Sequence, residues 1–489
     1  MINLMETQLE IIKKASISIE KRKYLEAKQI LLDYIKKNRN VEIDKEFYFT
    51  LYLVSEKLKE IQNCKKYLEK CLEKDSSNYV ILNNLGNIFF REGNVEKAEK
   101  LYKQSYQIKK DYLLAVINIA ILYQNIGMLD ESKKFYLKAI ELSPKQLSLY
   151  YNLSRIDKNF IDKQKIDFLS NLMKNEKISL SEMSWGFFLL AEYERKKKNF
   201  SKEFEYLTKG HTKAFDSNLK ANLLTLNYWQ NIIPKNYNKF SFKNIDNENK
   251  FINFKPIFII GLPRSGSTIV DAMLTSSSGA LSSLGESSIF NGIIASNFSK
   301  NQDQNNQLDF NNIINKISNI FFERNYDIKN YSFIDKSLEN FFYIDVILKI
   351  FPKAKFINTF RNLEDNILAI FKASLSKLSW THKLDDVLKY INNYIKIIDY
   401  YNQKYPKKIL RVDLENLTER PEDLSKKIYF FCDLKWTNDV LKFQNRKDLL
   451  ISTASNIQIR ENIHQYNFEK YKPYKEFLKN FTTKYSWIN

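Results

Sequence analysis

Residues 261–268, with the sequence GLPRSGST, have the composition of a loop that binds phosphate. They follow the apolar run 256–260 and precede a segment in which a helix is expected to begin. In such a strand-loop-helix unit, the loop amides and the helix N-terminus can surround a phosphate group. The glycine spacing is that of a Walker A loop, but Ser267 occupies the position of the lysine that nucleoside triphosphatases require. Since the positive charge lies at Arg264 instead, the sequence predicts an anion site and disfavours an ordinary nucleoside triphosphatase.

A second arginine follows another apolar segment. Residues 354–360 are expected to form a strand, and Arg361 comes directly after it. The planar guanidinium fork fits a phosphate group well. An ion pair with Asp365 at the start of a helix is the alternative interpretation. The presence of both arginine segments in one chain favours the phosphate site.

Both segments closely resemble the nucleotide-binding motifs of sulfotransferases, in particular the protein-tyrosine and tetratricopeptide-linked branches. The resemblance implies that the first segment binds the 5′-phosphosulfate of 3′-phosphoadenosine 5′-phosphosulfate (PAPS) and that Arg361 binds the 3′-phosphate. Residues 453–460 and the following Lys470, Tyr471 and Tyr474 resemble the C-terminal segment that covers the nucleotide in this branch. The cofactor-binding residues implied in this way are Arg264, Ser265, Gly266, Ser267, Thr268, Arg361, Ser455, Gln458 and Lys470.

The resemblance also implies catalytic residues. Sulfuryl transfer is an in-line displacement that needs a base for the acceptor hydroxyl and positive charge for the phosphate leaving group, and by resemblance it needs no metal. The family's catalytic carboxylate lies in a Gly-Glu segment, for which Gly285-Glu286 is the counterpart, so Glu286 is the expected base. Lys336 of Asp335-Lys336, together with Arg264, is expected to neutralise the departing phosphate. Tyrosine sulfotransferases have a second glutamate where this chain has Ser287.

The chain departs from the family pattern at two further positions. The family places a serine eight residues after the second arginine, where this chain has Ala369, and a tyrosine where it has Leu414. One hydrogen bond to the 3′-phosphate is therefore expected to be missing. These departures leave open a domain that binds nucleotide without turning it over.

An α/β domain is expected to position these residues. Strands are predicted at 256–260, 354–360 and 408–412, and helices at 341–351 and 384–405. Alternation of strands and helices implies a mainly parallel sheet flanked by helices. We place this P-loop-like sulfotransferase-type domain at residues 252–489, after a linker at 216–251 whose residues show no helical period.

The first part of the chain contains an internal repeat. Gly86 and Tyr102 recur 34 residues later as Ala120 and Tyr136. A period of this length with small and aromatic positions resembles the tetratricopeptide repeat, in which a small residue lets two helices approach closely. We therefore expect an all-α tetratricopeptide solenoid over residues 1–215, with its aromatic side chains packed in the core and its concave surface available to a protein partner.

Composition and charge narrow the possible partners and cellular locations of the protein. The net charge of +20 favours an anionic partner, but no zinc finger, basic zipper or RNA-binding signature indicates nucleic acid. No apolar run is long enough to span a membrane, no signal peptide is recognisable, and three cysteines are too few for a disulfide framework. A cytoplasmic protein is expected, and heavy use of Lys, Asn and Ile suggests a bacterial source.

The sequence as a whole predicts a PAPS-dependent sulfotransferase that acts on a hydroxyl acceptor, with a polypeptide or a glycan as candidates. The main alternative is a catalytically inactive repeat scaffold with a residual nucleotide-binding domain. A phosphotransferase that uses the 261–268 loop is a third interpretation, which the serine in place of the lysine disfavours.

Overall fold

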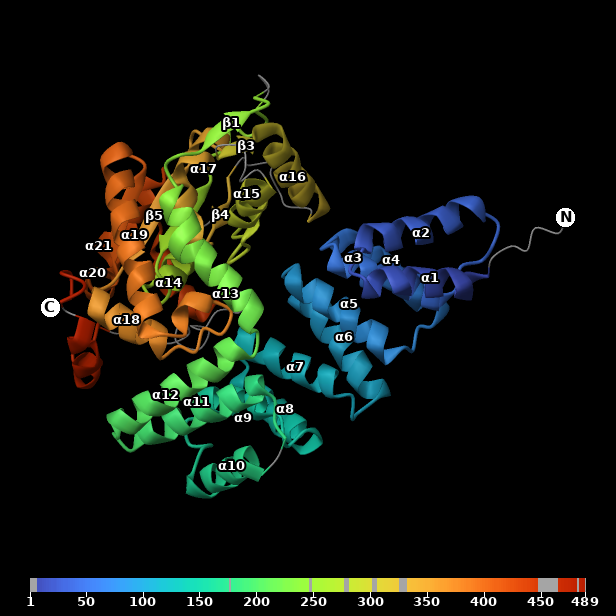
Figure 1. Cartoon of the computed structure of the whole chain (residues 1–489), viewed down its shortest axis with the longest axis horizontal. Helices are drawn as coiled ribbons and strands as arrows, with labels where there is room; N and C mark the ends of the chain where they lie inside the picture. The colour runs from blue at the N-terminus through green and yellow to red at the C-terminus, as the bar shows by residue number, and fades with distance from the viewer. Residues whose placement is uncertain are drawn as a thin grey trace. The chain divides into compact units, whose positions relative to one another are not determined.

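The computed structural model describes residues 7–175, 177–245, 249–276, 281–300, 306–324, 332–446, 465–481 and 483–488. The chain divides into two compact units. The first contains the described residues of Met1–Pro144 together with Ile320–Tyr326, and the second contains those of Lys145–Asn319 and Asp327–Asn489. Each unit is described separately below (Figure 1).

The first unit is built from pairs of helices that are consecutive in the sequence. They are α1 (Gln8–Glu20), α2 (Tyr24–Lys37), α3 (Lys45–Lys57), α4 (Ile61–Lys74), α5 (Tyr79–Arg91), α6 (Val95–Ile108), α7 (Leu113–Ile126) and α8 (Leu129–Leu142). In the α5–α6 pair a side chain at Gly86 would bring a Cβ within 2.6 Å of the Tyr102 ring. Tyr102 and Tyr136 are both buried, so the repeat aromatics form the core as expected.

The second unit begins with four more helices of the same kind. They are α9 (Leu147–Ile156), α10 (Lys163–Asn175), α11 (Leu180–Lys196) and α12 (Phe200–Asp216). Although the sequence analysis grouped these helices with the repeats, α9 to α12 belong to the same compact unit as the α/β fold.

The segment expected to be a linker contains regular structure. It forms α13 (Leu219–Asn227), the short turns η1 (Tyr228–Ile232) and η2 (Ile233–Lys235), and strand β1 (Ser241–Lys243). β1 pairs in parallel with β3 (Gln307–Asp309) in a two-stranded sheet. Helices α15 (Ile289–Lys300) and α16 (Phe310–Glu323) lie on either side of β3 in the sequence.

A four-stranded parallel sheet forms the centre of the second unit. Its order is β4-β2-β5-β6, with β2 at Ile257–Gly261, β4 at Ile334–Asp335, β5 at Lys355–Phe360 and β6 at Ile409–Asp413. Every residue of β2 is buried, as the continuous apolar run predicted. The predicted strands at 256–260, 354–360 and 408–412 are thereby confirmed, whereas the short β4 was missed.

The strands of this sheet alternate in the sequence with α-helices and 3-10 helices, and further helices follow β6. These helices are α14 (Ser267–Leu274), η3 (Leu338–Tyr343), α17 (Ile344–Ile350), α18 (Leu363–Phe371), η4 (Ser379–Thr381), α19 (Leu384–Lys404), α20 (Leu414–Glu419), α21 (Pro421–Phe431), η5 (Asn438–Asn445) and η7 (Lys472–Phe481). The fold is therefore a parallel sheet flanked by helices, preceded by a helical solenoid, as the sequence predicted.

The register of the sheet aligns the carboxyl ends of its strands. Gly261 at the end of β2 pairs with Thr359, and Phe360 at the end of β5 pairs with Asp413 at the end of β6. Ligands of open parallel sheets bind at this edge, where the strands deliver residues from separate parts of the chain. The predicted anion-binding segments follow β2 and β5, so they meet there.

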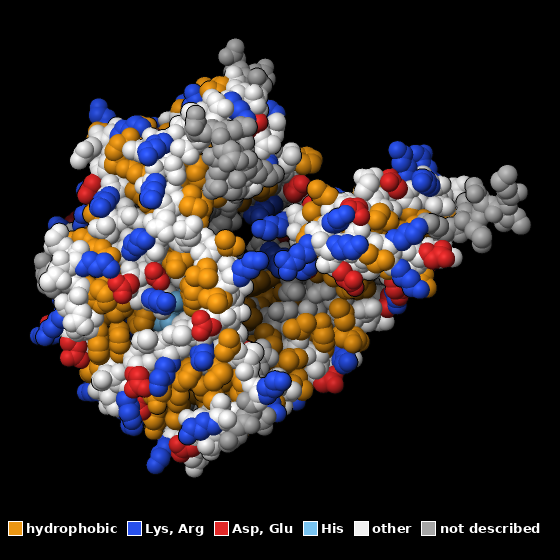
Figure 2. Space-filling view, in the orientation of Figure 1, with side chains coloured by type: hydrophobic (Ala, Val, Ile, Leu, Met, Phe, Trp, Pro, Cys, Tyr) orange, Lys and Arg blue, Asp and Glu red, His pale blue; other side chains and the backbone are white. Residues whose placement is uncertain are grey.

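Charged side chains are mixed on the surface, and the three thiols are buried. On the face shown in Figure 2, lysine and arginine side chains are scattered among acidic and uncharged ones. Burial raises the pKa of Cys64, Cys71 and Cys432 to about 12, which keeps these thiols protonated at neutral pH. Among the described helices, none combines the length and the apolar character needed to cross a bilayer.

Candidate anion-binding and transfer site

The phosphate-type loop turns sharply between β2 and α14. Arg264 has a left-handed backbone conformation with φ of 66°, which a non-glycine residue adopts rarely. Gly266 has φ of 95°, and a Cβ there would come within 2.8 Å of the Leu414 side chain. The Ser265 hydroxyl donates to the Leu262 carbonyl oxygen at 2.7 Å, which braces the loop from inside.

Helix α14 begins directly after this turn. Gly266 is its N-cap residue, and a glycine has no side chain that could cap the first-turn amides. Ser267 and Thr268 form the first turn and are both buried. The amides at such a helix N-terminus carry partial positive charge, so this end of α14 suits an anion.

Arg361 lies beside the loop and is held by aromatic side chains. Its Nη1 donates to the Arg264 carbonyl oxygen at 3.3 Å, and its Nε donates to the Tyr466 hydroxyl at 2.8 Å. The rings of Tyr466 and Tyr471 each lie 5.0 Å from the guanidinium carbon. Asp365 accepts from the Tyr466 hydroxyl at 2.6 Å, so the alternative of an Arg361–Asp365 interaction takes the form of a bridge through a tyrosine.

Several positive charges act on one another in this region. Burial lowers the pKa of Arg264, and the positive charges of Arg361 and Arg155 act in the same direction. Arg155 comes from α9, which the sequence analysis did not connect with the site. A partly desolvated group of like charges is unfavourable by itself and is relieved by a bound anion.

Glu286 and Lys336 are brought together by backbone pairing beside β4. The amide of Leu284 donates to the Ile334 carbonyl at 2.8 Å, and the amide of Lys336 donates to the Gly285 carbonyl at 3.0 Å. The Lys336 ammonium then lies 3.5 Å from Glu286 Oε1. The lysine side chain is buried, whereas that of Glu286 is 54% exposed, so the carboxylate can be reached by an acceptor from solvent.

Asp271 is a partner of Lys336 that the sequence analysis missed. Its Oδ2 lies 3.7 Å from the Lys336 ammonium, and its Oδ1 accepts from the Ser283 hydroxyl at 2.7 Å. Asp271 lies on α14, the helix that begins at the phosphate-type loop. Because α14 carries both features, it connects the arginine pair with the Glu286–Lys336 pair. An isolated aspartate in a helix gives no sequence signal for such a role.

The Asp335 carboxylate is buried and organises this strand end. It accepts hydrogen bonds from the Ser287 hydroxyl at 2.6 Å, the Ser337 amide at 3.0 Å and the Asn340 side chain at 2.7 Å. Burial raises its pKa to about 6 despite these bonds. The Ser287 hydroxyl therefore has a buried structural partner.

Glu339 is a second acidic side chain near this strand end. Burial is the main cause that raises its pKa to about 7, and the negative charges of Glu286 and Asp335 add to the shift. The sequence could not show that Glu339 lies near Glu286, because the two glutamates are 53 positions apart.

The two departures from the family pattern lie in packed surroundings. Ala369 is buried in α18, and Leu414 packs against the loop at Gly266. Lys470 is exposed, with its ammonium 5.5 Å from the ring of Tyr471, which also lies over Arg361. Ser455 and Gln458 lie outside the described residues.

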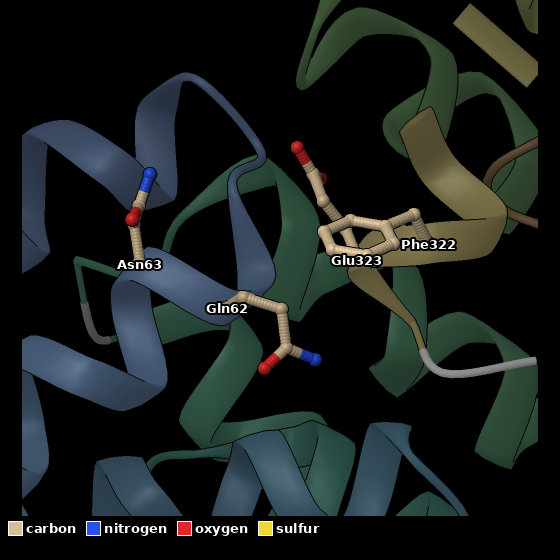
Figure 3. Close-up of a pocket in the computed structure, with 4 residues that line it drawn as sticks. All are labelled: Gln62, Asn63, Phe322 and Glu323. Carbon is tan, nitrogen blue, oxygen red and sulfur yellow. The ribbon is translucent and has the colours of Figure 1, made fainter. Parts of the chain in front are cut away.

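A pocket elsewhere in the described structure is separate from these residues. A pocket in the first unit is lined by Gln62 and Asn63 of α4 and by Phe322 and Glu323 of α16 (Figure 3). None of the sequence-predicted site residues lines it. The described residues include no group of three histidine, cysteine or carboxylate side chains placed to hold a metal ion.

Two parts of the chain are similar to known protein families. A sulfotransferase family model matches residues 256–438, and a tetratricopeptide repeat model matches residues 79–112 and 115–146. An uncharacterized protein of Aquifex aeolicus is 24% identical over 443 residues, which cover 86% of this chain and 56% of the relative. The mouse protein O-mannosyl-transferase TMTC3 is 28% identical over 116 residues, which cover 24% of this chain and 12% of the relative.

Solved structures resemble the chain more distantly. The sulfotransferase STF1 of Mycobacterium tuberculosis aligns over 61% of this chain and 98% of its own, with 12% identity and a TM-score of 0.28. The type IV pilus biogenesis factor PilW aligns over 44% of this chain and 95% of its own, with 12% identity and a TM-score of 0.33. By the two family matches, tetratricopeptide repeats in the first part of the chain precede a region, residues 256–438, that is similar to the sulfotransferase family.

Proposed function

We propose that the chain transfers a sulfuryl group from PAPS to a hydroxyl acceptor. The family match supports sulfuryl transfer in general, and the pairing of Arg264 with Arg361 at the carboxyl edge of the sheet supports a donor with two anionic ends. Because a guanidinium fork binds phosphate oxygens bidentately, the two arginines fit the 5′-phosphosulfate and the 3′-phosphate, respectively. This arginine pair is the observation that carries the proposal.

In the proposed reaction, Glu286 is the base. Its exposed carboxylate removes the proton of the acceptor hydroxyl as the acceptor oxygen forms a bond to sulfur. The bond between sulfur and the bridging phosphate oxygen breaks, and adenosine 3′,5′-bisphosphate leaves. Lys336, which is held by Asp271 and Glu286, neutralises charge on the bridging oxygen together with Arg264. The products are the sulfated acceptor and the bisphosphate, with the proton on Glu286.

The remaining cofactor contacts of the proposal come from the loop and the C-terminal segment. The amides of residues 265–268 at the start of α14 hold the 5′ end. Tyr466 and Tyr471 hold Arg361 in position for the 3′ end. Ser455, Gln458 and Lys470 are further proposed contacts on the basis of the resemblance alone.

A polypeptide or a glycan is the proposed class of acceptor. Tetratricopeptide arrays present extended concave surfaces that bind peptides and proteins, which favours a polypeptide. The chain spans 56% of the Aquifex relative and 12% of the mouse relative. The proposed location of this activity is the cytoplasm, and the proposed source is bacterial.

The test is calorimetric titration of adenosine 3′,5′-bisphosphate into the full chain and into an Arg264→Ala, Arg361→Ala double variant. We expect micromolar binding to the intact chain and at least a 100-fold loss in the variant, since each charged hydrogen-bond partner contributes about 1.5–3 kcal/mol. A double variant of the exposed Arg22 and Arg39, both changed to alanine, removes the same charge elsewhere and should bind normally. Absence of binding to the intact chain would refute the proposal.

The second candidate function is nucleotide binding without transfer, which the buried Ala369 favours because no hydroxyl is available at that position. Transfer of sulfur-35 from labelled PAPS to a mixed panel of peptides and glycans distinguishes the two. Tight binding of the bisphosphate without label transfer to any acceptor, and without hydrolysis of the donor, would favour the scaffold. ATP turnover that depends on magnesium would instead favour a phosphotransferase.

A further inference from the structure

Helix α12, the last helix of the repeat-like series, packs directly on two elements near Arg361. The ring of Phe204 stacks on Phe477 of η7, with centroids 4.0 Å apart and planes 7° apart. The same ring lies 5.2 Å from Phe371 at the end of α18. All three elements belong to the second unit, so this packing is part of one compact body.

A buried carboxylate lies at the centre of this contact. Glu203 of α12 is 2% exposed, and its Oε1 lies 2.9 Å from the ammonium of Lys372, the residue after α18. Its Oε2 accepts from the hydroxyl of Tyr474 in η7 at 2.5 Å. The Lys372 ammonium also lies 3.5 Å from the centroid of the Tyr474 ring. One side chain of α12 thus connects α18 with the C-terminal segment.

Both partners of Glu203 belong to segments that contain or contact Arg361. Helix α18 begins two residues after Arg361, and the C-terminal segment places the rings of Tyr466 and Tyr471 over its guanidinium group. The centroids of Tyr471 and Tyr474 are 6.5 Å apart, so the ring over Arg361 is adjacent to the ring that Glu203 holds. Loss of the carboxylate therefore releases the segment at a point close to the predicted 3′-phosphate contact.

The charge of Glu203 matters as much as its hydrogen bond. Burial lowers the pKa of Lys372 to about 8, and the Glu203 charge opposes this effect. Removal of one partner of a buried ion pair leaves an uncompensated charge, which favours rearrangement toward solvent. An uncharged residue at 203 should therefore loosen both Lys372 and the Tyr474 contact.

We propose that Glu203 is a positioning residue for nucleotide binding, which couples the last repeat helix to the C-terminal segment that covers Arg361. The inference rests on the proposed function for its nucleotide, but the coupling itself can be measured without one. It implies that the terminal repeat helices are part of the donor site and cannot be removed without loss of donor affinity. No sequence motif marks Glu203, because 169 residues separate it from Lys372 and 271 from Tyr474.

The experiment compares Glu203→Gln with Glu205→Gln in the full chain. Glu205 lies two residues away on the same helix, and its ion pair with Lys209 at 2.5 Å is exposed, which makes it a matched control. In calorimetric titration of adenosine 3′,5′-bisphosphate, we expect about tenfold weaker binding for Glu203→Gln and a change below about twofold for the control. If label transfer is observed, the KM for PAPS should rise similarly while kcat stays within about twofold.

A second measurement needs no nucleotide. Hydrogen–deuterium exchange of residues 466–481 should be faster in Glu203→Gln than in wild type and unchanged in Glu205→Gln. If the wild type binds no bisphosphate, the proposed function fails, and the exchange result alone decides whether Glu203 holds the segment. Unchanged exchange together with wild-type affinity in Glu203→Gln would overturn the inference.

A milder variant covers the case in which Glu203→Gln does not fold. Tyr474→Phe removes one hydroxyl and keeps the Glu203–Lys372 pair. We expect it to weaken bisphosphate binding about threefold to fivefold and to speed exchange of the same segment. Wild-type affinity and wild-type exchange in Tyr474→Phe would equally overturn the inference.

Discussion

The two buried histidines His211 and His382 make acid stability a measurable property of the second unit. Their Nδ1 atoms are 3.2 Å apart, and Nε2 of His211 lies 2.6 Å from the Phe371 carbonyl oxygen. Since a carbonyl only accepts, Nε2 of His211 carries the proton, and its Nδ1 accepts from Nδ1–H of His382. In this arrangement Nδ1 of His211 carries no proton, so the His211 ring is neutral. Nε2 of His382 is buried with no hydrogen-bond partner in the described part of the chain.

The size of the effect follows from proton linkage. Burial is the main cause that lowers the pKa of His211 to about 3 and that of His382 to about 4. The unfolded chain takes up protons at both histidines as the pH falls through about 6.5, and the folded chain does not. Stability is therefore full above that pH and decreases below it. At pH 5.5 the loss relative to pH 8 is about 1.4 kcal/mol for each histidine, because both folded values lie well below 5.5.

The variant that tests this effect is His382→Asn. Asparagine keeps an N–H near the position of Nδ1 but takes up no proton in the unfolded chain. Urea unfolding at pH 8 and pH 5.5 should be followed by tryptophan fluorescence, because all five tryptophans lie in the second unit. The loss of unfolding free energy between the two pH values should be smaller in the variant than in the wild type by about 1.4 kcal/mol.

The informative quantity is the difference in pH dependence of unfolding free energy between the wild type and His382→Asn. Asp335 and Glu339 have raised folded pKa values, so they stabilise the folded chain as the pH falls and oppose the histidines in both proteins. Their contribution cancels when the variant is compared with the wild type. An equal pH dependence in the two proteins, within about 0.5 kcal/mol, would refute the reasoning.

Three further predictions follow from named contacts. Glu286→Gln should lower kcat for sulfuryl transfer by about 100-fold to 10,000-fold while calorimetric binding of the bisphosphate changes little, and an equal loss of both would contradict its role as base. Ser287→Ala removes a hydrogen bond from the buried Asp335 carboxylate and should cost about 1–3 kcal/mol of urea stability above pH 6, with a smaller cost at pH 5, where the carboxyl is protonated. Gly86→Ala places a methyl against the Tyr102 ring and should destabilise the first unit by about 1–3 kcal/mol in urea unfolding followed by circular dichroism, whereas a neutral effect would show that the helix pair can shift apart.

The sequence alone determined those features that depend on local pattern. The apolar run before Gly261 and the loop after it identified a strand and a phosphate-type turn, because buried parallel strands are continuously apolar. The 34-residue recurrence of small and aromatic positions identified the helix pairs, since the absence of a side chain at Gly86 leaves room for the ring of Tyr102. Spacing could also indicate Arg264 and Arg361, because Arg361 directly follows a predicted strand and Arg264 lies in the loop after another.

The tertiary structure decided every contact that joins distant parts of the chain. The short strand β4 was missed because two residues carry no periodicity, and it is this strand that brings Lys336 to Glu286. Asp271, Tyr466 and Glu203 are ordinary residues in their local sequence, and only tertiary packing gives them partners. The same reason applies to the predicted end of the repeat region at residue 215, because α9 to α12 pack with the α/β fold. Local sequence records which residues are helical, whereas the side chains that Glu203 and His211 contact decide that α9 to α12 belong with the α/β fold.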